Sequence, residues 1–107
     1  MAFDALEVAI RLCAALREPL DRIRQHDPNL AEQAKRACNG VPLQLSEARR
    51  RTGRDRLNRY RTAAGSADEL KTALRVAMAW RYLDADALAE PLALLDRLLA
   101  MCWRLTH

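Results

Sequence analysis

Apolar residues recur at alternating steps of three and four along most of the chain, the spacing of one face of an α-helix. The first such segment covers residues 3–25, and its main stripe consists of Leu6, Ala9, Cys13, Leu16, Leu20 and Ile23. A second stripe runs beside it and consists of Ala5, Val8, Leu12 and Ala15. We expect the first stripe to fill a core and the second to face a neighbouring subunit. Pro19 predicts a kink, because proline lacks an N–H donor and its ring clashes with the turn before it.

The second helical segment covers residues 30–51 and follows a turn at 26–29, in which Asp27 or Asn29 suits the N-cap position. Its stripe consists of Leu30, Ala34, Ala37, Val41, Leu45 and Ala48. Residues 39–42 interrupt it with a glycine and a proline, which are typical of a helix end and a new helix start. Because the apolar phase continues across them, one kinked helix is favoured, with two shorter helices as the alternative.

Two more helices are predicted, at residues 54–83 and 85–105. The inner stripe of the third consists of Tyr60, Ala63, Ala67, Leu70, Leu74 and Ala77. The fourth follows a capping segment at 84–86 and has a first stripe of Leu88, Leu92, Leu95, Leu99 and Cys102. Its second stripe consists of Leu94, Leu98, Met101 and Leu105 and is again a candidate subunit contact. Four helices with short links predict an all-α fold, an antiparallel up-down-up-down four-helix bundle, with residues 1–107 as one domain.

Composition supports an all-helical chain of 107 residues, since leucine and alanine supply most of the apolar residues. The three cysteines, Cys13, Cys38 and Cys102, are odd in number and show no Cys-x-x-Cys spacing, so we expect buried, reduced thiols. No apolar run approaches the length needed to span a bilayer, and no basic, cleavable leader is visible. A cytoplasmic protein without membrane contact is the expectation.

Positive charge is concentrated in one window of a chain whose formal net charge is +4. Between positions 49 and 61 there is one acid, Asp55, and seven arginines: Arg49, Arg50, Arg51, Arg54, Arg56, Arg59 and Arg61. The planar guanidinium fork matches phosphate geometry and keeps its charge at every physiological pH. These seven residues are therefore candidates for nucleic-acid binding. The alternative is a solvated helix end paired with acids of a neighbouring chain.

The remaining polar candidates favour structural roles. Gln44 and Glu47 lie one turn apart near the apolar seam, where such a pair usually fixes register or meets an arginine of the next helix. Gly65, Ser66 and Glu69 lie in mid-helix without the strand or lysine of a phosphate-binding loop, so we expect close helix packing there. His26 and His107 are isolated, which leaves no metal or catalytic set, and no cofactor is predicted. We expect Trp80, Tyr82 and Trp103 to cover the core or a subunit interface. An enzyme is not expected.

Two stretches of the chain match known motifs. The first reads Val41-Pro42-Leu43-Gln44-Leu45-Ser46-Glu47-Ala48 and is followed by an arginine-rich stretch. It resembles the Ile-Pro-Ala-Asn-Ile-Ala-Glu-Gly segment of the four-helix-bundle family, which is also called the rRNA intervening-sequence protein family. Residues 63–70 resemble its Ala-Arg-Gly-Ser-x-x-Glu-Leu motif, and the opening Phe3 with Leu6-Glu7-Val8 also fits. The chain departs from the family at Gln44, Ala48 and Arg59. Pro42 matches the family proline and is expected to have a structural role.

The resemblance implies a homo-oligomeric bundle, typically a five-fold ring, with a charged end. A related group, the accessory proteins of diversity-generating retroelements, binds a reverse transcriptase and nucleic acid. A five-fold ring would gather a charge of about +30 at the arginine-rich end. The sequence thus predicts a non-enzymatic oligomer that binds the RNA or DNA backbone. The alternative is a scaffold for a protein partner such as a reverse transcriptase.

Overall fold

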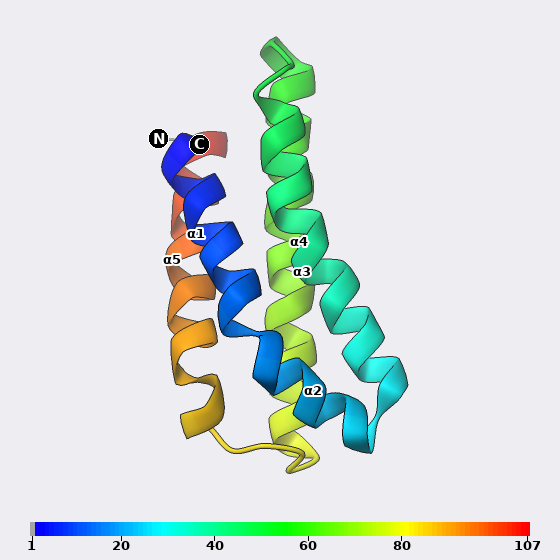
Figure 1. Ribbon diagram of the computed structural model, residues 1–107. Helices are drawn as coiled ribbons and strands as arrows, with labels where there is room; N and C mark the ends of the chain where they lie inside the picture. The colour runs from blue at the N-terminus through cyan, green and yellow to red at the C-terminus, as the bar shows by residue number, and fades with distance from the viewer. Residues whose placement is uncertain (1) are drawn as a thin grey trace.

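The computed structural model describes residues 2–107, with side-chain surroundings from residue 4 onward, so the side chain of Phe3 lies outside the described part. Five α-helices and one short 3₁₀ helix follow one another along the chain, and the described residues contain no strand (Figure 1). The elements are α1 (Ala2–Ala15), α2 (Arg17–His26), α3 (Pro28–Ala48), α4 (Gly53–Ala79), η1 (Asp86–Leu88) and α5 (Ala89–Thr106). The prediction of an all-α chain is confirmed.

The first predicted helix is two helices rather than one kinked helix. α1 ends at Ala15, and α2 begins two residues later with Pro19 in its first turn. The proline ring clashes with the carbonyl four residues before it, which belongs to Ala15, so a continuous helix would fail at this residue. Leu16 bridges the break, since its N–H lies 3.0 Å from the carbonyl oxygen of Leu12 and 3.3 Å from that of Cys13.

The second predicted helix is continuous through its glycine and proline, as favoured from the apolar phase, although it ends at Ala48 rather than at 51. Asp27 caps it, accepting a hydrogen bond from the N–H of Leu30 at 3.0 Å. At Gly40 the helix approaches α4 so closely that an added Cβ would lie 2.9 Å from Oγ of Ser66. The glycine at this position therefore permits close packing of α3 on α4.

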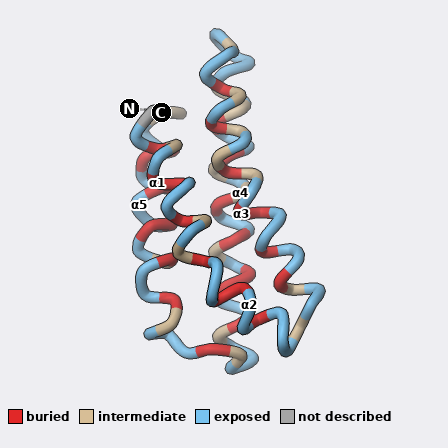
Figure 2. The backbone as a smooth tube through the Cα atoms, viewed as in Figure 1, coloured by how far each residue is buried: buried red, intermediate tan, exposed pale blue. Residues whose placement is uncertain are grey.

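α3 and α4 form the most extensive contact of the fold, and α5 also packs against α4. α1 packs against both α5 and α3, so α1, α3, α4 and α5 form a closed cycle of contacts, and α2 packs along α3 as a further neighbour (Figure 1). The buried apolar side chains form one cluster, which Figure 2 shows as red segments facing the inside of the helical assembly. The molecule measures 42 × 22 × 20 Å, and the α3–α4 pair extends beyond the ends of α1 and α5 (Figure 1).

The second apolar stripes of the first and last helices are not free flanks. Val8 and Leu12 are 3% and 1% exposed within the single chain, and Leu98 is fully buried. The expectation that these stripes face a neighbouring subunit is wrong, because the one chain already uses them in its own core. The large apolar side chains left exposed are others: Ile10, Leu43, Val76, Trp80 and Trp103.

Candidate nucleic-acid interface

Residues 49–59, which contain six of the seven arginines of the basic window, form the projecting end of the α3–α4 hairpin, and Arg61 follows within α4 (Figure 1). Ala48 and Tyr60 are buried, but no residue from 49 to 59 is. We call residues 49–61 the arginine tip. With Glu47 included, the segment holds seven arginines and two acids, a net charge of +5.

The turn at this tip depends on one glycine and one arginine. Thr52 is extended, and Gly53 starts α4 with a φ of +58°, a conformation that side chains with a Cβ disfavour. Arg56 then reaches back along the chain. Its Nε donates to the carbonyl oxygens of Arg51 at 2.8 Å and Ala48 at 3.2 Å, which satisfies carbonyl groups at the end of α3.

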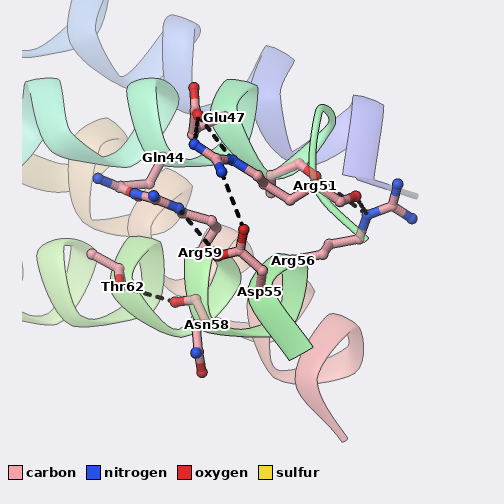
Figure 3. Close-up of polar contacts among 9 residues, drawn as sticks. Gln44, Glu47, Arg51, Asp55, Arg56, Asn58, Arg59 and Thr62 are labelled. Carbon is pink, nitrogen blue, oxygen red and sulfur yellow. Dashed lines mark hydrogen bonds and ion pairs between the residues drawn. The ribbon is translucent and has the colours of Figure 1, made fainter. Parts of the chain in front are cut away.

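Arg51 and Arg59 form a polar network across the hairpin (Figure 3). Arg51 donates to Oε1 of Glu47 at 2.6 Å and to Oδ2 of Asp55 at 3.2 Å, so its guanidinium lies between two carboxylates. Arg59 lies 3.9 Å from Asp55 and donates to Oε1 of Gln44 at 3.3 Å, which links α4 to α3. Gln44 and Glu47 therefore each meet an arginine.

The hydrogen bond from Arg51 lowers the pKa of Glu47, and the positive charges of Arg51, Arg59 and Arg50 act in the same direction. In return, Glu47 and Asp55 raise the pKa of Arg51. Glu47 thus stays ionised at neutral pH, and together with Asp55 it holds Arg51 in place.

Four arginines of the tip have side chains that make no hydrogen bond or ion pair with any residue that the structure describes: Arg49, Arg50, Arg54 and Arg61. All four are exposed. Acids of the same chain therefore pair only with Arg51 and Arg59, while Arg56 has carbonyl partners. The alternative, pairing of the tip with acids of a neighbouring chain, stays a prediction. The guanidinium groups of the other four arginines are exposed and without side-chain partners in the described chain.

The residues expected to provide close helix packing are only partly placed there. Gly65 is exposed, and a Cβ built on it would have no neighbour within 4 Å, so the prediction that it permits close packing is wrong. The tight contact of this region instead joins Ser66 to Gly40. Glu69 is exposed on α4, whereas Pro42 is half-buried inside α3. The segment 63–67 consists of small residues on every side, so its composition did not show which side faces α3.

A pocket of about 450 Å³ beside the arginine tip was not predicted from the sequence. It lies between α4 and α5, and its lining includes Arg61, Gly65, Trp103 and His107. The rings of Trp103 and His107 stack with centroids 3.4 Å apart, and Trp103 is 61% exposed. Trp80 is 66% exposed, so neither tryptophan covers the core of the single chain, and the other expected role for them, at a subunit interface, stays a prediction. Trp103 and His107 are four residues apart, the spacing of about one helical turn, which was the available signal in the sequence.

The described part of the chain contains no group of three or more His, Cys, Asp or Glu side chains placed to hold a metal ion. Among the same residues, no helix combines the length and the apolar character that crossing a bilayer requires. Neither result adds a second candidate site to the arginine tip.

Comparison with known proteins gives one family. The model of the 23S rRNA-intervening sequence protein family matches residues 3–104, nearly the whole chain. No curated protein and no solved structure matches the chain. The match agrees with the resemblance of residues 41–48 and 63–70 and with the helical fold described above. The chain therefore belongs to the 23S rRNA-intervening sequence protein family.

Proposed function

We propose that this protein is a non-enzymatic binder of the RNA or DNA backbone that uses the arginine tip. In this proposal the chain is an antiparallel up-down-up-down bundle that assembles into a homo-oligomeric ring in the cytoplasm. The order of packing neighbours, α1 with α3 and α5 and α4 with α3 and α5, fits such a bundle. The family description, a protein of 23S rRNA intervening sequences, fits an association with RNA.

The observation that carries the proposal is the set of unpaired arginines on a projecting hairpin. The side chains of Arg49, Arg50, Arg54 and Arg61 are exposed and make no hydrogen bond or ion pair in the described chain. Binding of a phosphate backbone releases counterions in proportion to the number of phosphates neutralised, which supplies sequence-independent affinity. A tip that stands clear of the bundle can approach a folded nucleic acid without steric conflict.

Contacts at the tip should be to phosphate rather than to bases. The one aromatic residue of the tip, Tyr60, is 7% exposed and belongs to the core, so it cannot stack on a base. Backbone contacts position a protein on nucleic acid but carry no sequence information. We therefore expect weak sequence preference.

Fluorescence anisotropy across a KCl series tests the proposal, with labelled single-stranded RNA and duplex DNA of equal length. The wild type should lose affinity steeply as salt rises. Changing Arg49, Arg50 and Arg54 together to Ala should reduce the slope for single-stranded RNA by about 2 per chain, at roughly 0.7 per lost phosphate contact. Light scattering of the same samples gives the number of chains per particle, which converts the slope to a value per chain.

The matched control changes Arg36, Arg75 and Arg97 to Ala, three exposed arginines on the body of the bundle. This variant loses the same net charge and should keep the wild-type slope. Equal slopes for the tip variant and the wild type would overturn the assignment to the tip. A wild type that binds neither probe at low salt would overturn nucleic-acid binding and favour the adaptor function, with an acidic protein such as a reverse transcriptase as partner.

A further inference from the structure

Two of the three cysteines, 25 residues apart in the sequence, lie next to each other between two helices. Cys13 on α1 and Cys38 on α3 have their Sγ atoms 3.4 Å apart, within hydrogen-bonding distance for sulfur. Cys13 is half-buried, Cys38 is 3% exposed, and both are free thiols. A disulfide has an S–S length near 2.05 Å, so a shift of little more than 1 Å would bring the two atoms into bonding distance.

The pair lies in the wall of a solvent-open pocket of about 480 Å³ with an excess of positive charge. Arg17, Arg24 and Lys35 line the pocket together with one acid, Asp21, which forms an ion pair with Arg24. Basic neighbours favour a thiolate and attract anionic reagents. Cys102 is different, because it is buried in the core and is not among the residues that line this pocket.

The two thiols are not equivalent. The hydrogen bond from Cys38 lowers the pKa of Cys13 to about 7, against the opposing effect of burial. The same hydrogen bond, together with burial, raises the pKa of Cys38. Burial also raises the pKa of Cys102. Cys13 is thus suited to attack first, and Cys38 to react second.

We infer that Cys13 and Cys38 form a thiol–disulfide exchange site for small disulfides that carry carboxylates, such as oxidised glutathione. The Cys13 thiolate attacks one sulfur of the small disulfide, forms a mixed disulfide and releases one small thiolate. Cys38 then loses its proton to solvent and attacks Sγ of Cys13, which forms the Cys13–Cys38 bond and releases the second small thiolate. Two protein thiols are oxidised, and one small disulfide is reduced to two thiols.

The product would join α1 to α3 and enclose α2 in a covalent loop. The break between α1 and α2 at Leu16 lies within this loop, three residues after Cys13. A cross-link restricts the unfolded chain, so the oxidised protein should unfold at a higher temperature than the reduced one. The bond is reversible by excess small thiol, as expected of a thiol pair in a reducing compartment.

The test incubates the full chain with oxidised glutathione and follows the products by intact mass and peptide mapping. The wild type should lose two hydrogens, with the peptides of Cys13 and Cys38 joined and Cys102 free. Cys38→Ala should stop at a mixed disulfide on Cys13 and gain one glutathione. Cys13→Ala should react at least tenfold more slowly, and Cys102→Ala should behave as the wild type.

The role of the pocket is tested separately by Lys35→Ala together with Arg17→Ala. This variant should react several-fold more slowly with oxidised glutathione but at the wild-type rate with the uncharged disulfide of 2-mercaptoethanol. Equal slowing with both reagents would overturn the charged pocket. A joined peptide that contains Cys102, or a wild type that gains glutathione without forming the Cys13–Cys38 bond, would overturn the exchange site. Mapping of the wild type decides this even where a cysteine variant fails to fold.

Discussion

The two ends of α4 differ in how far the residues around them are buried. Around its first residues, no residue from 49 to 59 is buried. Just beyond its last turn, Tyr82 is half-buried and Leu83 is 4% exposed. The first end is positioned by exposed contacts, such as the pairs of Arg51 with Glu47 and Asp55. The other end is positioned by stacked rings: the centroids of His26 and Tyr82 lie 5.0 Å apart. Exposed ion pairs contribute little to stability. The arginine tip is therefore the end whose side chains can change without unfolding the bundle.

The end of α4 opposite the arginine tip is tied to the helices around it. The hydroxyl of Tyr82 donates to Oδ2 of Asp27 at 3.4 Å, and Asp27 also caps α3. Partial burial and the Asp27 carboxylate raise the pKa of Tyr82, so the hydroxyl keeps its proton through the neutral range. This end of the molecule thus contributes to the fold itself, while the arginine tip is left free for binding.

The largest expected difference is between a buried leucine in the second half of α4 and a leucine at the tip. Leu74 is fully buried, so Leu74→Ala should lower the free energy of unfolding by about 2–5 kcal/mol. Leu57 at the tip is only half-buried, and Leu57→Ala should cost about 1 kcal/mol or less. Urea denaturation followed by circular dichroism measures both. Similar losses for the two variants would show that the tip belongs to the cooperative core.

A second comparison concerns the turn that starts α4. Gly53 has a φ of +58°, and an added Cβ would meet nothing within 4 Å, so the cost of Gly53→Ala is conformational alone. We expect a loss of about 1–2 kcal/mol in the free energy of unfolding. Gly65→Ala is the matched control, since Gly65 is also exposed and unobstructed but lies in mid-helix, where alanine should stabilise by about 0.5–1 kcal/mol. If both substitutions changed the free energy of unfolding in the same direction, the requirement for glycine at position 53 would be contradicted.

The helices and several of their ends could be predicted from the sequence, because apolar spacing and short-range capping act within a few residues. Asp27 as the cap of α3 and the continuity of α3 through Pro42 are examples. The site was predictable as a cluster, since the seven arginines are adjacent in sequence. Which of them are unpaired was not, because the Arg59–Gln44 contact depends on how α3 and α4 align across the hairpin.

Contacts between segments that are distant in the sequence could not be predicted either, because they also depend on how the helices align. The choice between Gly40 and Gly65 as the point of close approach depends on the rotation of each helix about its own axis, and the uniformly small residues 63–67 give no indication of it. The contact between Cys13 and Cys38 likewise requires that α1 and α3 pack against each other and that the two residues lie at the same position along the helix axes. An odd number of cysteines pointed away from any pair.

The smallest expected effect lies at the other end of α4, where Arg81 has a φ of +61°. Its N–H bonds to the carbonyl oxygen of Met78 at 2.9 Å, and that of Tyr82 to the carbonyl oxygen of Ala77 at 3.0 Å, a helix end that normally carries glycine. Arg81→Gly should therefore raise the free energy of unfolding by about 0.5–1 kcal/mol, since the relief of the left-handed strain exceeds the entropy that glycine loses on folding. Arg81→Ala removes the same charge but keeps the strain, so urea denaturation should show no gain for it. A gain of equal size in both variants would assign the effect to the lost charge instead. The left-handed backbone of Arg81 would then not be the cause of the lower stability, and the contrast with Gly53 at the other end of α4 would not hold.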